Sequence, residues 1–199
     1  MRLATWNINS IRTRVGRAVD FAVREDIDVL ALQEIKCKPE QFPYAPFEEA
    51  GYHVEVHGLN QWNGVAIASR LPVTDVRTSF DGMPGFAKGH EGPDVPLEAR
   101  ALGVMVEGVR VWSLYVPNGR ALDDPHYLYK LHWLEQLKKS TAAELSANPD
   151  LPLALVGDFN IIPFDVDNGD PDIVIGRSTH VSPQERDAFF AFQDAGVTD

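Results

Sequence analysis

The sequence is short of cysteine and has no apolar run that approaches the length of a membrane span. Its one cysteine, Cys37, excludes an internal disulfide and a zinc site built from cysteine pairs. The N-terminus also lacks a charged region followed by a long apolar stretch, which argues against a signal peptide. From these absences we expect a soluble, cytoplasmic protein that does not bind a membrane.

Basic residues are also scarce, because 18 Lys and Arg stand against 29 Asp and Glu and give a formal net charge of −11. Such a balance argues against broad, non-specific binding to nucleic acid. The deficit is not uniform, since residues 1–38 hold seven basic and five acidic residues, a net charge of +2. This N-terminal region could meet a polyanion, although an ordinary solvated surface explains the same charges.

The order of apolar patterns predicts an α/β fold. Apolar runs at 3–5 and 29–32 flank an amphipathic segment at 11–25, which indicates a strand, a helix and a second strand. Further strands, several of them paired antiparallel through short turns, are predicted at 52–57, 64–69, 73–80, 101–106 and 109–116. The length of 199 residues fits a single domain, 1–199, with a substantial core.

Two helices are predicted in the second half of the chain. A stripe of leucines at 128, 131, 134, 137 and 145 predicts a long helix over 127–145, followed by a strand at 153–156. The sequence Ser182-Pro183-Gln184-Glu185 is a capping box with proline at the first helical position, so a last helix should run from there to Gly196. Between 82 and 96 a stretch rich in Gly and Pro predicts a surface loop.

Short polar clusters follow three of the apolar runs that we expect to form strands buried on both faces. They are Trp6-Asn7-Ile8-Asn9, Leu32-Gln33-Glu34-Ile35-Lys36 and Gly157-Asp158-Phe159-Asn160. A fourth cluster, Tyr115-Val116-Pro117-Asn118-Gly119-Arg120, ends another predicted strand. Each cluster alone is explained by a strand exit or a turn, but four in one chain favour one active site assembled at strand ends.

The side chains in these clusters favour hard metal ions and phosphate. Glu34, Asp158, Asn7 and Asn160 offer oxygen ligands without the sulfur or imidazole that zinc sites use, so Mg²⁺ or Mn²⁺ fits them. Such an ion would neutralise the charge that develops on a reacting phosphate, while a carboxylate orients or deprotonates a water and an amide donates to phosphoryl oxygens.

The fourth cluster adds candidates for binding a nucleic acid. The Tyr115 hydroxyl could reach a phosphate, and Asn118 and Arg120 could hold a nucleic-acid backbone. Together the clusters predict phosphodiester chemistry.

These motifs, with Asn63-Gly64-Val65-Ala66-Ile67, resemble in order and spacing those of the exonuclease III family of bacterial apurinic/apyrimidinic endonucleases. The resemblance covers almost the whole chain. It implies a four-layer α/β sandwich, two mixed β-sheets face to face with flanking helices, in the wider endonuclease/exonuclease/phosphatase superfamily. It also implies Mg²⁺-dependent cleavage of double-stranded DNA on the 5′ side of abasic sites, with 3′-to-5′ exonuclease and 3′-phosphatase activities in DNA repair. We expect the protein to be a monomer.

The resemblance also assigns roles to single residues. It implies that Glu34 is the principal metal ligand with Asn7 beside it, and that Asp158 is the acid/base group and a further metal ligand. Asn160 would hold the phosphate or a second metal position, and Tyr115 would support the phosphate in the transition state. The implied substrate contacts are Lys36, Asn63, Asn118 and Arg120.

The sequence departs from the family pattern in two places. Family members continue to a Ser-Asp-His motif that supplies a second catalytic Asp and a catalytic His, and none of the six histidines, at 53, 57, 90, 126, 132 and 180, lies in such a motif. We therefore expect the C-terminal part of the family domain to be absent and this chain to be weakly active or inactive. Glu98-Ala99-Arg100 stands where the family commonly has Glu-Gly-Arg, which should affect packing only.

Other interpretations stay open at this point. The chain could be a phosphodiesterase of the same superfamily that acts on phosphoinositides, sphingomyelin or undamaged DNA, or a non-catalytic DNA-binding protein that kept the scaffold. His53, Glu55 and His57 share one face of a predicted strand, where a polar outer face is a simpler explanation than zinc. The acidic loop at 165–172 lacks the ligand spacing of a calcium loop, so we expect a solvated loop there.

Overall fold

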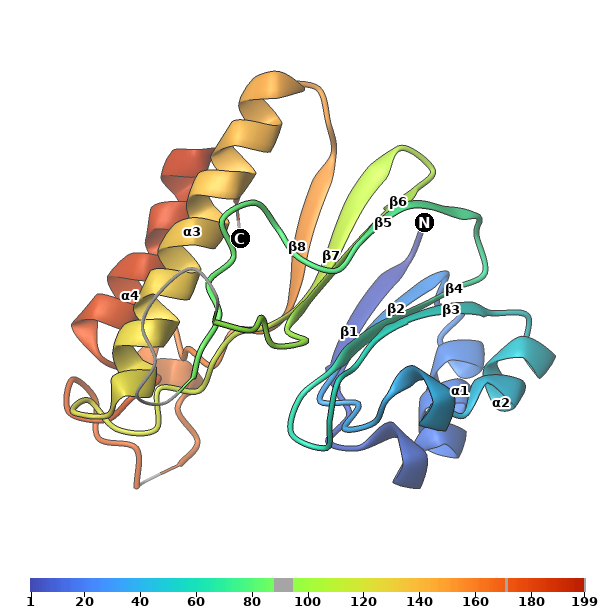
Figure 1. The fold of residues 1–199 in the computed structure, drawn as a ribbon, viewed down its shortest axis with the longest axis horizontal. Coiled ribbons are helices and arrows are strands. Elements are labelled where there is room, and N and C mark those ends of the chain that lie inside the picture. Colours follow the sequence, from blue (N-terminus) through green and yellow to red (C-terminus); the bar gives the residue numbers. More distant parts are fainter. Residues whose placement is uncertain (88–94, 171, 199) are drawn as a thin grey trace. The chain divides into compact units, whose positions relative to one another are not determined.

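The computed structural model describes residues 1–87, 95–170 and 172–198 (Figure 1). The chain forms two compact units, which are described separately. Unit 1 comprises Met1–Ser79, Glu98–Tyr115 and Leu151–Asp158, and unit 2 comprises Phe80–Leu97, Val116–Asp150 and Phe159–Asp199. The expectation of a single domain over residues 1–199 stays a prediction.

The first sheet of unit 1 contains four strands in the order β1-β2-β4-β3. β1 (Leu3–Asn7) and β2 (Val29–Gln33) are parallel and are connected through the 3₁₀ turn η1 (Ile11–Thr13) and α1 (Val15–Arg24). β4 (Val65–Ser69) pairs antiparallel with β2 and with β3 (His53–His57). The strand, helix and strand predicted at the start of the chain are confirmed.

The second sheet has the order β5-β6-β7-β8. β5 (Val73–Arg77), β6 (Ala101–Val106) and β7 (Val109–Tyr115) pair antiparallel, and β8 (Leu153–Asp158) runs parallel to β7. Each sheet is therefore mixed and contains one parallel pair. The C-terminal ends of these pairs carry the polar clusters.

The two sheets pack face to face through aliphatic side chains. Val29, Ala31, Val65 and Ile67 of the first sheet lie in one buried cluster with Leu102, Val104, Val106 and Val111 of the second. Leu30, Leu32, Ala66 and Ala68 on the other face of the first sheet pack with residues of α1 and α2 (Tyr44–Glu49) (Figure 1).

Burial along the strands differs from the expectation in part. All five residues of β2 are buried, as predicted for a strand covered on both faces. β1 and β8 are only partly buried, because each stands at the edge of its sheet with a single neighbour. α2 was not predicted, since Pro43 and Pro46 favour a turn there, and a further 3₁₀ turn, η2 (Pro39–Gln41), precedes it.

Unit 2 contains the long helix α3 (Pro125–Ala147) and the shorter α4 (Pro183–Phe190), which pack against each other (Figure 1). α4 begins with the predicted capping box, and it ends earlier than predicted, since η4 (Ala191–Ala195) continues the chain to Gly196. A further 3₁₀ turn, η3 (Asp165–Asp167), lies between the two helices in the sequence. In the part of the chain that is described, no helix is long and apolar enough to cross a membrane.

The buried face of α3 follows the predicted leucine stripe only in part, at Leu134 and Leu137. Leu128 is 69% exposed, and the buried positions of the helix are Tyr127, Tyr129, Lys130, Trp133, Leu134, Leu137 and Thr141. The stripe was wrong at its start because two tyrosines and a lysine, rather than a leucine, occupy the inward positions. Of the surface loop predicted at 82–96, residues 88–94 lie outside the described residues.

Candidate active site

The side chain of Asn7 links two carboxylates. Its Nδ2 donates to Glu34 Oε1 at 2.9 Å and to Asp158 Oδ2 at 2.7 Å. Asn7 and Asp158 are the last residues of β1 and β8, and Glu34 directly follows β2. Because the two sheets face each other, residues 151 positions apart in the sequence meet at one amide group. The structure thus brings together three of the four side chains named in the metal prediction, while the fourth, Asn160, belongs to unit 2.

Glu34 is surrounded by donors. Lys36 Nζ lies 2.7 Å from Glu34 Oε2 and also donates to Asn9 Oδ1 at 2.6 Å. Burial by itself raises the pKa of Glu34, but hydrogen bonds from Asn7, Lys36 and Tyr115 and the charge of Lys36 bring this pKa below its ordinary value. Glu34 is therefore ionised at neutral pH, as a metal ligand must be.

Tyr115, the last residue of β7, has a strongly raised pKa. Burial is the main cause, and the negative charges of Glu34 and Asp158 add to it. The hydroxyl donates to Glu34 and remains protonated at neutral pH. The Arg100 guanidinium lies over the Tyr115 ring, 4.9 Å from its centroid, so the ring is held between a carboxylate at its hydroxyl and a cation on its face.

A second group of residues extends this network. Arg100 Nε donates to Glu98 Oε2 at 2.7 Å, and Asn63 Nδ2 donates to Glu98 Oε1 at 3.2 Å. Asn63 is 1% exposed, and its Oδ1 is buried without a hydrogen-bond partner. The structure therefore places the Asn63 side chain against Glu98, below the surface of the protein.

Sequence reasoning missed Glu98 and Arg100 as site residues. No pattern in the sequence indicates this role, because their partners Asn63 and Tyr115 come from distant segments. The residue between them, Ala99, is fully buried, and its carbonyl accepts a hydrogen bond from Gly64 N at 3.0 Å. That this alanine affects packing only stays a prediction.

The backbone is strained at several of these positions. Glu34 and Lys36 have φ values of 52° and 53°, and Asn9 has a φ of 44°. A non-glycine residue in the left-handed region costs of order 1 to 3 kcal/mol, and such residues cluster at functional sites. Their side chains meet here at the Lys36 ammonium, which contacts both Glu34 and Asn9, and this supports a functional interpretation.

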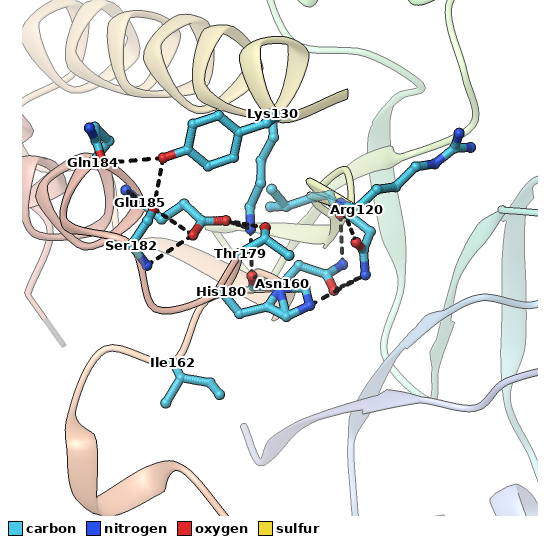
Figure 2. A network of polar contacts seen from close by, with 12 residues as sticks. Arg120, Lys130, Asn160, Ile162, Thr179, His180, Ser182, Gln184 and Glu185 are labelled. Atoms are coloured by element: carbon cyan, nitrogen blue, oxygen red, sulfur yellow. Dashed lines mark hydrogen bonds and ion pairs between the residues drawn. The ribbon is translucent and has the colours of Figure 1, made fainter. Parts of the chain in front are cut away.

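The remaining predicted residues lie in unit 2, around Asn160 (Figure 2). Asn160 Nδ2 donates to the Val116 carbonyl at 2.9 Å, and Asn160 Oδ1 accepts from Asn118 Nδ2 at 3.3 Å. Asn118 Oδ1 in turn accepts from the backbone N–H of Arg120 at 2.8 Å. The structure thus brings Asn118, Arg120 and Asn160 together, with Asn118 and Arg120 exposed.

His180 joins this group and was not predicted. Its Nδ1 lies 2.7 Å from the Asn160 carbonyl oxygen, and its Nε2 lies 3.5 Å from Asn118 Nδ2. Since a carbonyl only accepts hydrogen bonds, the imidazole proton is on Nδ1 and Nε2 is the acceptor. Nothing in the sequence around His180 indicates this role, because its partners come from two distant segments.

The donor set of unit 1 fits a hard cation. Magnesium is usually held by one or two carboxylates with waters and substrate phosphate, and Glu34 and Asp158 provide two adjacent carboxylates. Asn7 turns its nitrogen toward them, and its Oδ1 accepts from Asn9 N at 3.1 Å, so Asn7 positions the carboxylates in this arrangement. Within the described residues, no three or more His, Cys, Asp or Glu side chains gather into a group that could hold a metal by themselves. His53, Glu55 and His57 on β3 therefore do not form such a group.

Comparisons with known proteins agree with this chemistry. Residues 4–197 match the model of the endonuclease/exonuclease/phosphatase family. Over 206 residues the chain is 27% identical to exodeoxyribonuclease III of Haemophilus influenzae, with 100% of this chain and 74% of that protein covered.

Two solved structures are similar along the whole chain. One is the 3′ phosphatase NExo from Neisseria bound to a product DNA hairpin, with a TM-score of 0.86 and 35% identity over 100% of this chain and 72% of that one. The other is an AP endonuclease from Archaeoglobus fulgidus, with a TM-score of 0.86, 32% identity and the same coverage of 100% and 72%. The predicted α/β class, with two mixed sheets and flanking helices, is confirmed by this likeness and by the strand order.

Proposed function

The chain belongs to the endonuclease/exonuclease/phosphatase family, and from this premise we propose that it is a DNA-repair phosphodiesterase of the exonuclease III type. The observation that carries the proposal is the single amide of Asn7 between the carboxylates of Glu34 and Asp158. Two carboxylates that share one amide donor, beside a protonated tyrosine, are suited to hydrolysis of a phosphodiester. The names of its relatives, an exodeoxyribonuclease III and an AP endonuclease, favour DNA as the substrate.

Three site residues of unit 1 have direct roles in this proposal. Glu34 and Asp158 would hold Mg²⁺, with Mn²⁺ as a substitute, and the bound ion would offset negative charge on the phosphoryl oxygens. Asp158 would also orient a water and accept its proton as the water oxygen bonds to phosphorus. The bond from phosphorus to the leaving sugar oxygen would then break, and that oxygen would take up a proton from solvent water. Tyr115 would donate to a phosphoryl oxygen through its protonated hydroxyl.

The substrate contacts are proposed from charge and exposure. Lys36, Asn118 and Arg120 would bind phosphates of double-stranded DNA. Asn63 would support the Lys36 contact, since the backbone carbonyl of Asn63 accepts a hydrogen bond from the backbone N–H of Lys36 at 3.0 Å. Trp62 is 72% exposed beside Asn63 and offers an aromatic face to a base. The preferred substrates would be abasic sites and 3′ ends, bound by a monomer. A DNA-repair activity also fits the cytoplasmic location expected from the sequence.

A panel of duplexes tests the proposal. We expect weak, Mg²⁺-dependent cleavage of a labelled duplex with an abasic site or a recessed 3′ end, in line with the low activity predicted from the sequence, and loss of this cleavage when EDTA removes the metal. Glu34→Gln should lower the rate by about 100-fold or more, because a neutral amide holds a divalent cation poorly. Glu55→Gln is the matched control, since Glu55 is a partly exposed carboxylate on β3 that pairs with His53.

Adding phosphoinositides, sphingomyelin and an undamaged duplex to this panel separates the alternatives. Metal-independent binding of the abasic duplex without turnover would favour a non-catalytic DNA-binding protein. Hydrolysis of phosphoinositides or sphingomyelin in place of DNA would favour another activity of the superfamily. Either result would overturn the proposal.

A further inference from the structure

Unit 2 contains a fully buried ion pair that the proposed chemistry does not use. Lys130 in α3 donates through Nζ to Glu185 Oε1 in α4, and both side chains are 0% exposed (Figure 2). Removing two charges from water costs several kcal/mol for each ion, so a buried pair is weak evidence for a purely stabilising role. The other contacts of the two side chains indicate a further role.

The Glu185 carboxylate accepts most of its hydrogen bonds from groups other than Lys130. Its carboxylate accepts hydrogen bonds from Thr179 Oγ1 at 2.7 Å, from Ser182 Oγ at 2.7 Å and from Ser182 N at 3.2 Å. The bond from Ser182 N, together with the bond from Glu185 N to Ser182 Oγ at 3.3 Å, forms the capping box that begins α4. The helix start therefore needs a Glu or Gln at 185, and it does not by itself require a buried lysine.

The second contact of Lys130 leads to Asn160. Lys130 Nζ donates to the Asn160 carbonyl oxygen at 2.6 Å, and the same oxygen accepts from His180 Nδ1 at 2.7 Å. Asn160 has a φ of 53°, a strained conformation that surrounding contacts must hold in place. Its side chain then bridges the Val116 carbonyl and Asn118.

The same cluster also restrains the loop that carries Asn118. A Cβ added at Gly119 would lie 2.4 Å from Thr179 Oγ1, so only glycine lets this loop approach the hydroxyl that donates to Glu185. The backbone of Asn160 and the loop at 116–120 therefore both depend on the geometry around Glu185 and Lys130. Both segments carry residues that we propose to bind DNA.

We propose that Lys130 and Glu185 form a positioning pair that holds Asn160, and through it Asn118, in the orientation that binds a DNA phosphate. The inference deepens the proposed function and rests on it. Lys130 acts through the Asn160 carbonyl, and neither member of the pair touches DNA. Thr179 and Ser182 fix the carboxylate that keeps the Lys130 ammonium directed at this carbonyl.

The test is a double-mutant cycle. The variant Lys130→Met with Glu185→Gln removes both charges, keeps the capping box and leaves no unpaired buried ion. We expect it to lower kcat on the abasic duplex by about 10- to 100-fold. In an Asn160→Ala background the same pair of changes should cost less than about twofold, because their effect passes through Asn160. Thr141→Val, which alters another buried polar group of α3, is the matched control and should leave kcat unchanged.

A second measurement keeps the result independent of turnover and of folding. Thermal melting shows whether each variant is folded, and NMR of the Asn160 side-chain amide reports its position directly. The proposal predicts a large shift of this amide signal in the paired variant and almost none in Thr141→Val. The paired change should also shift the NMR signal of the Asn118 side-chain amide. This Asn118 shift should be smaller in an Asn160→Gly background, because glycine relieves the backbone strain at φ 53° and lacks the side chain that contacts Asn118.

Two results would overturn the proposal. One is an equal loss of kcat in the presence and absence of the Asn160 side chain, and the other is an unchanged Asn160 amide signal in the folded paired variant. A wild-type chain without nuclease activity would contradict the proposed function, and the NMR measurement would then decide the positioning claim by itself.

Discussion

Glu34 has a carboxylate whose ionised form is favoured by three neighbouring donors, Asn7, Lys36 and Tyr115. Its pKa in the folded protein is lower than the ordinary value of 4.5. A lowered pKa means that the ionised carboxylate stabilises the folded state at every pH above the unfolded value. This contribution is lost as the pH falls through the folded value.

The change Glu34→Gln should therefore alter how stability depends on pH. We expect the difference in free energy of unfolding between wild type and this variant to be larger at pH 7 than at pH 3. Urea unfolding curves measured across this range provide the check. A difference that stays constant over the range would show that the donors around Glu34 do not favour its charge.

Tyr115 is the second residue whose ionisation matters, and Tyr115→Phe removes only its hydroxyl. We expect kcat to fall by about 100- to 1,000-fold with little change in KM, as for loss of one donor to a developing charge. Because the pKa of Tyr115 lies above its ordinary value, the wild-type rate should not fall between pH 8 and about 10 through loss of the phenolic proton. A pH profile of kcat for both proteins tests this, and a fall in this range only in the wild type would contradict it.

At the scale of elements, the approach of β8 to β7 fixes where Asp158 stands. Gly157 precedes Asp158 and has a φ of 148°, and a Cβ at this position would lie 2.0 Å from the Leu114 carbonyl oxygen. The parallel pairing of the two strands at Leu114 and Gly157 therefore requires glycine.

Gly157→Ala should destabilise the protein by about 2 to 4 kcal/mol, since it combines backbone strain with a steric clash. Gly108→Ala is the matched control, because Gly108 has a φ of 80° and no atom within 4 Å of the added Cβ. It should cost only about 1 to 2 kcal/mol. Equal losses of stability in urea unfolding would show that β8 can move away from β7 without penalty.

The elements also show how far the sequence could predict this structure. The strands and the long helices follow from local apolar spacing, which needs no knowledge of distant residues. The buried face of α3 does not, because the partner that allows Lys130 to be buried, Glu185, lies 55 positions further along the chain. α2 escapes prediction because prolines favour turns, although the first turn of a helix tolerates them.

The candidate site likewise contains residues that the sequence could predict and contacts that it could not. Asn7, Glu34 and Asp158 could be named in advance because each ends an apolar run and matches a family motif. Their mutual geometry could not, since the sequence does not show which amide lies between two carboxylates. His180 and Arg100 were missed because their roles come from contacts with Asn160 and Tyr115, which the fold alone creates.

At the scale of the whole molecule, the net charge of −11 limits how DNA can be bound. An acidic protein has little long-range attraction for a polyanion, so its affinity must depend on a few local phosphate contacts. Arg120 is an exposed cation beside Asn118, and its backbone conformation, with a φ of 60°, is held by that neighbour.

Arg120→Ala should consequently weaken DNA binding by a similar factor for every sequence and lesion. The slope of log Kd against log salt should become shallower by about 0.9, the value for one lost phosphate contact on duplex DNA. Fluorescence anisotropy at several salt concentrations measures both quantities. Arg24→Ala is the control, because Arg24 is an exposed arginine that pairs with Glu25, and it should leave the slope unchanged. An unchanged slope in Arg120→Ala would show that this arginine does not contact a phosphate, and a similar change in both variants would show that overall charge governs DNA binding.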